Sequence, residues 1–202
     1  MPSIRRSAEE PPSAAVSPRP RLLGFLPLVF FLAHSVYYWK NGGLGNLLWM
    51  CNVANLMLAA GLMLGWRWLI RLSVIWLVPG LPLWLYYVAF TGGWLLTSFF
   101  THVGGLIVGL AALSAVRASE WTWLHGFAWY VILQQVSRVA TAPELNVNVA
   151  HSVYQGWENA FGAYWQYWLA TTALTAVGLW ILGWILLKLF PPGGEKAAGP
   201  NA

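Results

Sequence analysis

The segment WLLTSFFTHVGGLIVGLAALSAV, residues 94–116, contains no charged side chain and is long enough to cross a bilayer. A helix needs about 20 mostly apolar residues to span the hydrocarbon core. Five other segments of similar character lie before and after it. We therefore predict an all-α membrane bundle of six transmembrane helices, at residues 22–39, 44–64, 68–90, 94–116, 121–139 and 164–190.

The composition agrees with a chain whose solvent is lipid. Hydrophobic residues make up 58% of the 202 residues and charged residues only 8%, whereas a soluble domain carries about 25% charged residues. Fifteen tryptophans and eight tyrosines suit the aromatic belts at the two membrane surfaces. The basic residues are dispersed, so we expect membrane lipid and no nucleic acid as partner. Nothing in the sequence sets an oligomeric state.

The segments outside the predicted bundle differ in composition. Residues 1–21 are rich in Pro, Ser, Ala and charge, so we expect a disordered cytoplasmic tail. The first apolar segment continues into YYWKNGG without a small-residue cleavage site, which indicates a retained helix. We expect a long outer loop at 140–163 and a flexible cytoplasmic tail at 191–202. Pro79, Gly80 and Pro82 predict that the third helix is kinked, broken or partly re-entrant.

Lysine and arginine set the predicted orientation, because cytoplasmic loops carry an excess of them. With the N-terminus inside, nine of the eleven basic residues fall on the inner side, and only Lys40 and Arg138 fall on the outer side. We therefore predict that both termini are cytoplasmic and that the long loop is outside.

Polar residues gather in the outer half of the predicted helices. At about 1.5 Å per residue, Cys51 and Asn52 lie roughly 10–12 Å below the outer surface, His102 roughly 12 Å and His34 roughly 8 Å. Polar groups are costly in a bilayer, so such a cluster is a candidate functional site. The alternative is packing, since hydrogen bonds between membrane helices contribute about 0.6 kcal/mol each. The other candidate binding or supporting residues are Asn46, Asn55, Gln134, Arg138, Asn146, Asn148 and His151.

Cys51 and His102 are the candidate catalytic pair. An imidazole within reach of a thiol can take its proton and generate a nucleophilic thiolate, and Asn52 or Asn55 could donate to a developing oxyanion. The substrate at that depth would be the ester region of a lipid, which indicates acyl transfer or ester hydrolysis.

Two other classes remain open. One is a non-catalytic lipid-binding or accessory membrane protein. The other is a haem- or metal-bearing subunit that uses His34 and His102, although the sequence contains no paired-histidine motif, and we predict neither a cofactor nor a metal site. A transporter is disfavoured, because no acidic residue lies inside a predicted span.

Three short motifs resemble known families. Residues 46–54, NLLWMCNVA, resemble the N-x-L-W-x-C-D-x-A helix of small bacterial membrane proteins without an assigned function. They resemble more distantly the L-x-L-C-D-x-A helix of YwaF-type proteins. Residues 98–104, SFFTHVG, resemble the F-F-x-S-H-G segment of those proteins, and Asn146-Val-Asn148 with Tyr154 resembles their N-x-N loop. The order and rough spacing agree over most of residues 22–190.

YwaF-type proteins are similar to a transmembrane acyltransferase group that is related to the androgen-induced lipid hydrolases. The resemblance places the proposed catalytic cysteine and histidine of that group on Cys51 and His102, and it implies a bacterial inner membrane location. The chain departs from the pattern at Asn52, where the family carries Asp. It also has Tyr154-Gln-Gly156 where the family has Tyr-Gly.

Overall fold

The chain is helical, and no strand occurs among the residues that the structure describes. The structure is a computed structural model that describes residues 18–192, and the predicted all-α class is confirmed there. The long helices are α2 (Phe25–Lys40), α3 (Met50–Leu64), α4 (Arg67–Thr91), α6 (Gly105–Val116), α7 (Thr122–Ala140) and α8 (Tyr164–Leu189). The short elements are α1 (Pro18–Leu23), α5 (Leu96–Phe99), the π-helical turn η2 (Phe100–Gly104), and the 3-10 turns η1 (Leu44–Leu48), η3 (Pro143–Leu145), η4 (Val147–Val149) and η5 (Glu158–Ala160).

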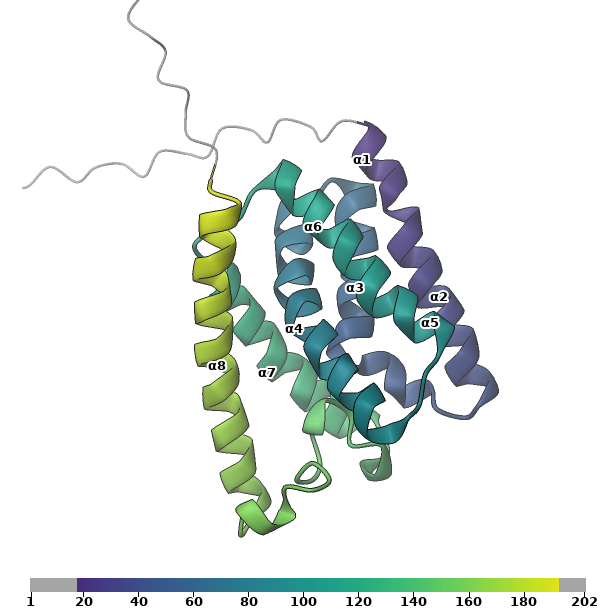
Figure 1. The fold of residues 1–202 in the computed structure, drawn as a ribbon, viewed down its shortest axis with the longest axis vertical. Coiled ribbons are helices and arrows are strands. Elements are labelled where there is room, and N and C mark those ends of the chain that lie inside the picture. Colours follow the sequence, from purple (N-terminus) through teal and green to yellow (C-terminus); the bar gives the residue numbers. More distant parts are fainter. Residues whose placement is uncertain (1–17, 193–202) are drawn as a thin grey trace, which may run out of the picture.

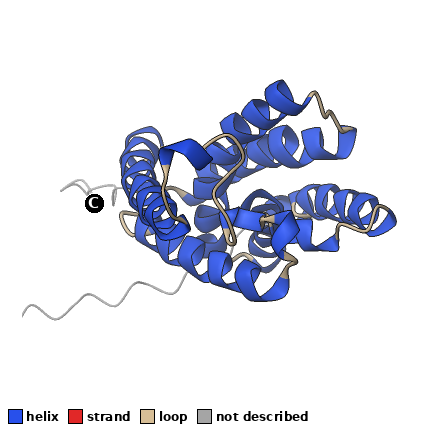
Figure 2. Cartoon of the chain, turned by 90° about the horizontal axis from the view of Figure 1, so that it is seen from below, coloured by secondary structure: helices blue, strands red, loops and turns tan. Residues whose placement is uncertain are grey.

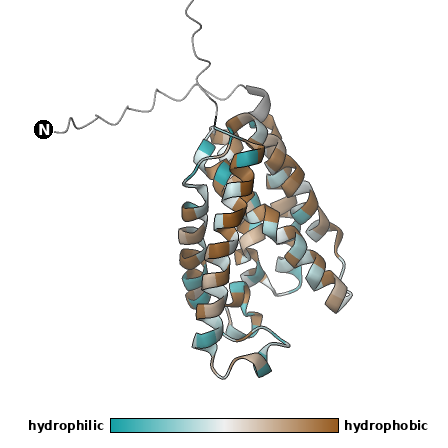
Figure 3. Cartoon of the chain, turned by 60° about the vertical axis from the view of Figure 1, so that its left-hand side comes forward, coloured by the Kyte–Doolittle hydropathy of each residue, from teal (hydrophilic) through white to brown (hydrophobic). Residues whose placement is uncertain are grey.

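Several of these helices suit a bilayer. Within residues 18–192, four helical segments are long and apolar enough to cross a membrane: Arg21–Lys40, Arg67–Thr91, Leu96–Val116 and Tyr164–Leu189. Met50–Leu64 is a shorter apolar helix. Large aliphatic side chains also face outward, such as Leu174 on α8, which is 72% exposed. Figure 3 shows hydrophobic colour along the outer faces of the visible helices. These features are typical of a membrane protein.

The helices lie side by side in one bundle, with α8 along one edge and α1 and α2 along the other (Figure 1). α4 is central, since it packs against α3, α6, α7 and α8. The start of α1 and the end of α8 lie at the same end of the bundle (Figure 1). The loop between α7 and α8 covers part of the opposite end, which Figure 2 shows from below. We call this the loop end.

Most predicted boundaries agree with the observed helices, with three differences. The second helix, predicted from residue 44, begins at Met50, because residues 44–48 form the separate 3-10 turn η1. The chain is already helical from Pro18, inside the segment expected to be disordered, while residues 1–17 and 193–202 of the two expected tails lie outside the described part. α4 runs unbroken through Pro79 and Pro82, so this segment contains neither a break nor a re-entrant piece. Glycines with positive φ, Gly65 (φ 73°) and Gly92 (φ 64°), end α3 and α4.

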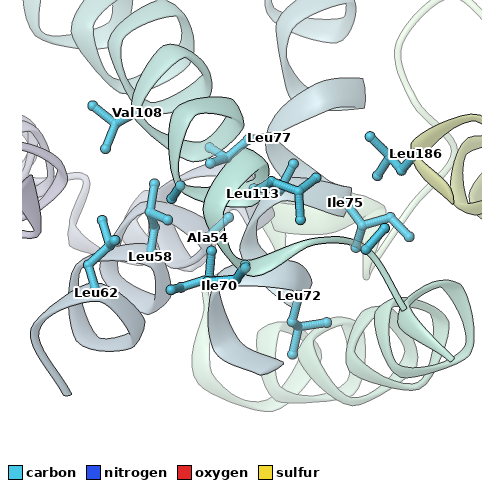
Figure 4. Close-up of a cluster of buried hydrophobic side chains, with 14 of the residues drawn as sticks. Ala54, Leu58, Leu62, Ile70, Leu72, Ile75, Leu77, Val108, Leu113 and Leu186 are labelled. Carbon is cyan, nitrogen blue, oxygen red and sulfur yellow. The ribbon is translucent and has the colours of Figure 1, made fainter. Parts of the chain in front are cut away.

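The main core lies where α3, α4 and α6 meet, and α8 covers one side of it. Figure 4 shows Leu58 of α3, Leu77 of α4 and Leu113 of α6 pointing into this cluster. Close approach of α6 depends on two glycines. A Cβ on Gly105 would overlap the Asn55 amide, and a Cβ on Gly109 would come within 3.1 Å of Val74. The Gly105-x-x-x-Gly109 spacing therefore lets α6 pack closely against α3 and α4.

Candidate functional site

The candidate site lies in the half of the bundle nearest the loop end, between α2, α3, α4 and the π turn. Cys51 is the second residue of α3, His34 lies on α2, and His102 lies in η2. His34 and His102 are buried at 2% and 8% exposure, whereas Cys51 is half-buried. The structure thus brings the predicted thiol and imidazoles to one region between four helical segments.

The π turn shapes the position of His102. A π turn adds one residue to a helical turn, and such turns are frequent at functional sites. Here it is tied to the neighbouring helix by the Asn55 amide, which donates to the Thr101 carbonyl at 2.9 Å and to the Cys51 carbonyl at 2.9 Å. One fully buried amide therefore joins the turn that holds the histidine to the turn that holds the cysteine.

The hydrogen bonds of His102 fix its tautomer. Its Nδ1 lies 2.8 Å from the Ser98 carbonyl oxygen. A carbonyl can only accept, so Nδ1 carries the hydrogen and Nε2 keeps a lone pair. The ring also stacks on Trp84 of α4, with centroids 5.3 Å apart and planes 14° apart. An aromatic face of this kind stabilises a cation beside it.

Gly80 lies between the cysteine and the histidine. A Cβ built on Gly80 would be 3.5 Å from Cys51 Cβ and 4.0 Å from His102 Cδ2. The two side chains therefore flank the same small space beside α4. No hydrogen bond joins the two side chains among the contacts of the described residues.

His34 occupies the α2 side of the site. Its Nδ1 lies 2.9 Å from Thr97 Oγ1, and its ring meets the edge of Tyr38 with centroids 4.5 Å apart. His34 and His102 belong to α2 and η2, which contact each other. Within the described part of the chain, however, no three His, Cys, Asp or Glu side chains come together as a metal-binding group. The metal alternative therefore depends on these two imidazoles alone.

The two asparagines expected to support an oxyanion have other contacts. Both N–H groups of the Asn55 amide already donate to backbone carbonyls, so the predicted donor role does not fit Asn55. Asn52 donates to the Asn46 carbonyl at 2.9 Å, which leaves it one N–H. The Oδ1 atoms of Asn52 and Asn55 are buried and accept no hydrogen bond within the described region.

The remaining predicted site residues form a separate group at the loop end. Asn148 is 5% exposed and makes three contacts: it donates to the Leu48 carbonyl and to Ser137 Oγ at 2.7 and 2.8 Å, and it accepts from Met50 N at 3.0 Å. It thus caps the start of α3 from a distant loop. We call this contact set the Asn148 latch.

Other polar residues complete the loop. The Gln134 amide accepts from Trp168 Nε1 at 2.7 Å and donates to the Asn148 carbonyl at 3.4 Å. Asn146 Oδ1 accepts from the backbone of His151 at 3.0 Å. Arg138 is exposed and lies over the Tyr164 ring, 5.6 Å from its centroid. These residues hold the loop in place and do not reach Cys51 or His102.

The loop also approaches the end of α4. Partial burial, with smaller contributions from Tyr86 and Tyr87, raises the pKa of Tyr154 above its ordinary value. The loop packs against the bundle through contacts of η4 with η1 and α7.

Trp84, Gly80 and Tyr38 are site residues that the sequence analysis did not select. Gly80 and Trp84 are four residues apart, so they share a face of α4. Aromatic residues and glycines are common in membrane helices, so the sequence offered no reason to select these. Only their contacts with Cys51, His102 and His34 identify them as site residues. Comparison with known proteins adds no assignment: no family model, curated protein or solved structure matches the chain.

Proposed function

We propose that this membrane protein acts on the ester region of a membrane lipid, by acyl transfer or ester hydrolysis, with Cys51 as nucleophile and His102 as base. The observation that carries the proposal is the His102 tautomer. Nδ1 is held by the Ser98 carbonyl, so Nε2 is left as the proton acceptor. Cys51 flanks the same space beside Gly80.

The chemistry follows from these positions. His102 Nε2 takes the thiol proton, and the Cys51 thiolate attacks the lipid ester carbonyl. The carbon–oxygen ester bond breaks, the acyl group remains on sulfur as a thioester, and the leaving alkoxide takes the proton from the imidazolium. A second alcohol or water then accepts the acyl group. The Trp84 ring stabilises the imidazolium in the intervening step.

Resemblance supports the same assignment. The cysteine and histidine of the similar acyltransferase group fall on Cys51 and His102. Asn52 replaces the family aspartate, so any role of that carboxylate in orienting the histidine is filled here by the Ser98 carbonyl.

A non-catalytic lipid-binding or accessory protein is the second candidate. It is favoured by the lack of a hydrogen bond between Cys51 and His102 among the described contacts. Catalytic hydrogen bonds are often long in an unliganded enzyme and shorten when the substrate binds. The catalytic candidate therefore predicts that bound lipid brings Cys51 and His102 into hydrogen-bond contact, and the non-catalytic candidate predicts that it does not.

The proposed topology places this site in the outer leaflet of a bacterial inner membrane. Six crossings require α3 and α7 to span in addition to the four long segments. α1, the start of α4 and the ends of α6 and α8 lie at the end opposite the loop (Figure 1). These segments carry Arg21, Arg67, Arg71, Arg117 and Lys188, which supports a cytoplasmic position for that end.

Turnover in proteoliposomes tests the proposal. The substrate is a phospholipid with a fluorescent acyl chain, and the readout is release or transfer of that chain. We expect Cys51→Ala and His102→Gln to lower the rate by about a hundredfold or more. Gly80→Ala should fold, since its Cβ would make only ordinary contacts, but it should slow turnover by filling the space between the pair.

The controls separate the candidates. Gly178→Ala adds the same methyl group where nothing lies within 4 Å, and it should keep full activity. Bound lipid without turnover in the wild type, unchanged by Cys51→Ala, would support the non-catalytic candidate. A visible absorption band in the purified protein that His34→Ala removes would support a haem site instead.

A further inference from the structure

The end of the bundle opposite the loop carries a second feature that the proposed chemistry does not use. A groove of about 410 Å³ lies between α4 and α7, lined by Trp68, Leu72, His125, Ala128, Trp129 and Ile132. Its volume falls within the range of about 300–1,000 Å³ typical of small-molecule sites.

The walls of the groove are formed by side chains on one face of α4 and one face of α7. Trp68 and Leu72 are four residues apart on α4, and His125, Trp129 and Ile132 follow at helical spacing on α7. Between His125 and Ile132, which line the groove on α7, the helix rises about 10 Å, against a hydrocarbon core of roughly 30 Å. The groove therefore runs along about two thirds of the depth of one membrane leaflet.

A smaller hollow with polar lining residues adjoins the end of the groove that is farther from the loop end. It is lined by Arg71, Ser119, Thr122 and His125 together with Trp68 and Leu72, so the two cavities share three residues. The Arg71 guanidinium donates to the Arg117 and Val116 carbonyls at 2.8 and 3.1 Å, which holds its charge at this position.

Two buried polar atoms near these cavities lack partners within residues 18–192. Thr122 is 6% exposed and its hydroxyl makes no hydrogen bond, and neither does Trp129 Nε1. A buried donor without an acceptor costs about 1–3 kcal/mol. An acceptor-rich group in the polar hollow would satisfy the Thr122 hydroxyl.

We propose that this groove binds one anionic phospholipid, with its phosphodiester in the polar hollow and an acyl chain along the α4–α7 groove. The charge at this end fits an anionic headgroup, because Arg67, Arg71 and Arg117 lie there. The site is independent of the Cys51 region, which lies in the other half of the bundle.

Native mass spectrometry of the full-length protein in detergent tests the proposal. The probes are phosphatidylglycerol and phosphatidylcholine with the same acyl chains, and glycerol 3-phosphate as the free headgroup. We expect one phosphatidylglycerol to bind at least about tenfold more tightly than phosphatidylcholine. Glycerol 3-phosphate alone should not compete, since it lacks the chain that fills the groove.

Matched variants locate the lipid. Ala128→Trp fills the groove and should abolish binding, while Ala111→Trp adds the same side chain to an exposed position of α6 and should not. Thr122→Val should reduce the preference for phosphatidylglycerol and leave binding of the chain intact. Equal lipid binding by both tryptophan variants would overturn the proposal, and so would a dimer that only Ala128→Trp dissociates, because a second copy would then cover the groove.

Discussion

At the scale of single residues, the Asn55 amide links α3 to the π turn η2. It is fully buried and bonded to the turns that carry Cys51 and His102. Gly105 permits this arrangement, because any side chain there would occupy the space of the amide. The placement of the Cys51 turn beside the π turn thus depends on a residue that the sequence analysis considered as an oxyanion donor.

Gly105→Ala should therefore destabilise the protein by about 1–3 kcal/mol, as overpacking does elsewhere. The Asn55 amide cannot move aside without losing a hydrogen bond. Thermal unfolding in detergent measures the effect. Gly178→Ala is the control, because the new methyl group meets nothing within 4 Å. Equal stability of the two variants would show that Gly105 does not fix the π turn.

At the scale of elements, the loop between α7 and α8 is held to the bundle by the Asn148 latch. Asn146 and Asn148 have φ of 41° and 52°, and Val149 has φ of 54°. Asparagine tolerates this left-handed region better than valine. The short Asn-Val-Asn motif therefore marks a backbone bend that places one amide against the start of α3.

Asn148→Ala should loosen that attachment. The Leu48 carbonyl and the Met50 N–H lose a buried partner, which costs roughly 2 kcal/mol or more. Hydrogen exchange should become faster at Met50 and across residues 146–152. Asn41→Ala removes only an exposed bond to the Tyr37 carbonyl and should leave exchange at these sites unchanged. Unaltered exchange in Asn148→Ala would contradict the role of the latch.

The helices were more predictable than the site. Long apolar segments located most helix ends within about three residues, since lipid requires apolar length, but α3 begins six residues later than predicted. Hydropathy could not distinguish a polar residue that holds a loop, such as Asn148, from one beside His102, such as Cys51. Both lie toward the same end of the bundle. The π turn and the stacking of Trp84 depend on contacts between helices, which spacing along one chain does not report.

At the scale of the whole molecule, the distribution of basic residues predicts which end of the bundle faces the cytoplasm. Labelling one residue at each end tests that prediction. Glu158 in the loop and Glu120 between α6 and α7 are both exposed and lie at opposite ends. In a Cys51→Ala background, Glu158→Cys should react with an impermeant maleimide added to intact cells. Glu120→Cys should react only after permeabilisation. The reverse pattern would place the candidate site in the inner leaflet.

The central claim is that Cys51 and His102 work as a pair on a lipid ester. Intact-protein mass spectrometry after incubation with a phospholipid tests it most directly. We expect the wild type to gain the mass of one acyl chain, with neutral hydroxylamine removing it. His102→Gln should show far less of the adduct, and Cys51→Ala none. A wild-type mass that stays the same as in the absence of lipid, or an adduct that persists in Cys51→Ala, would contradict the account.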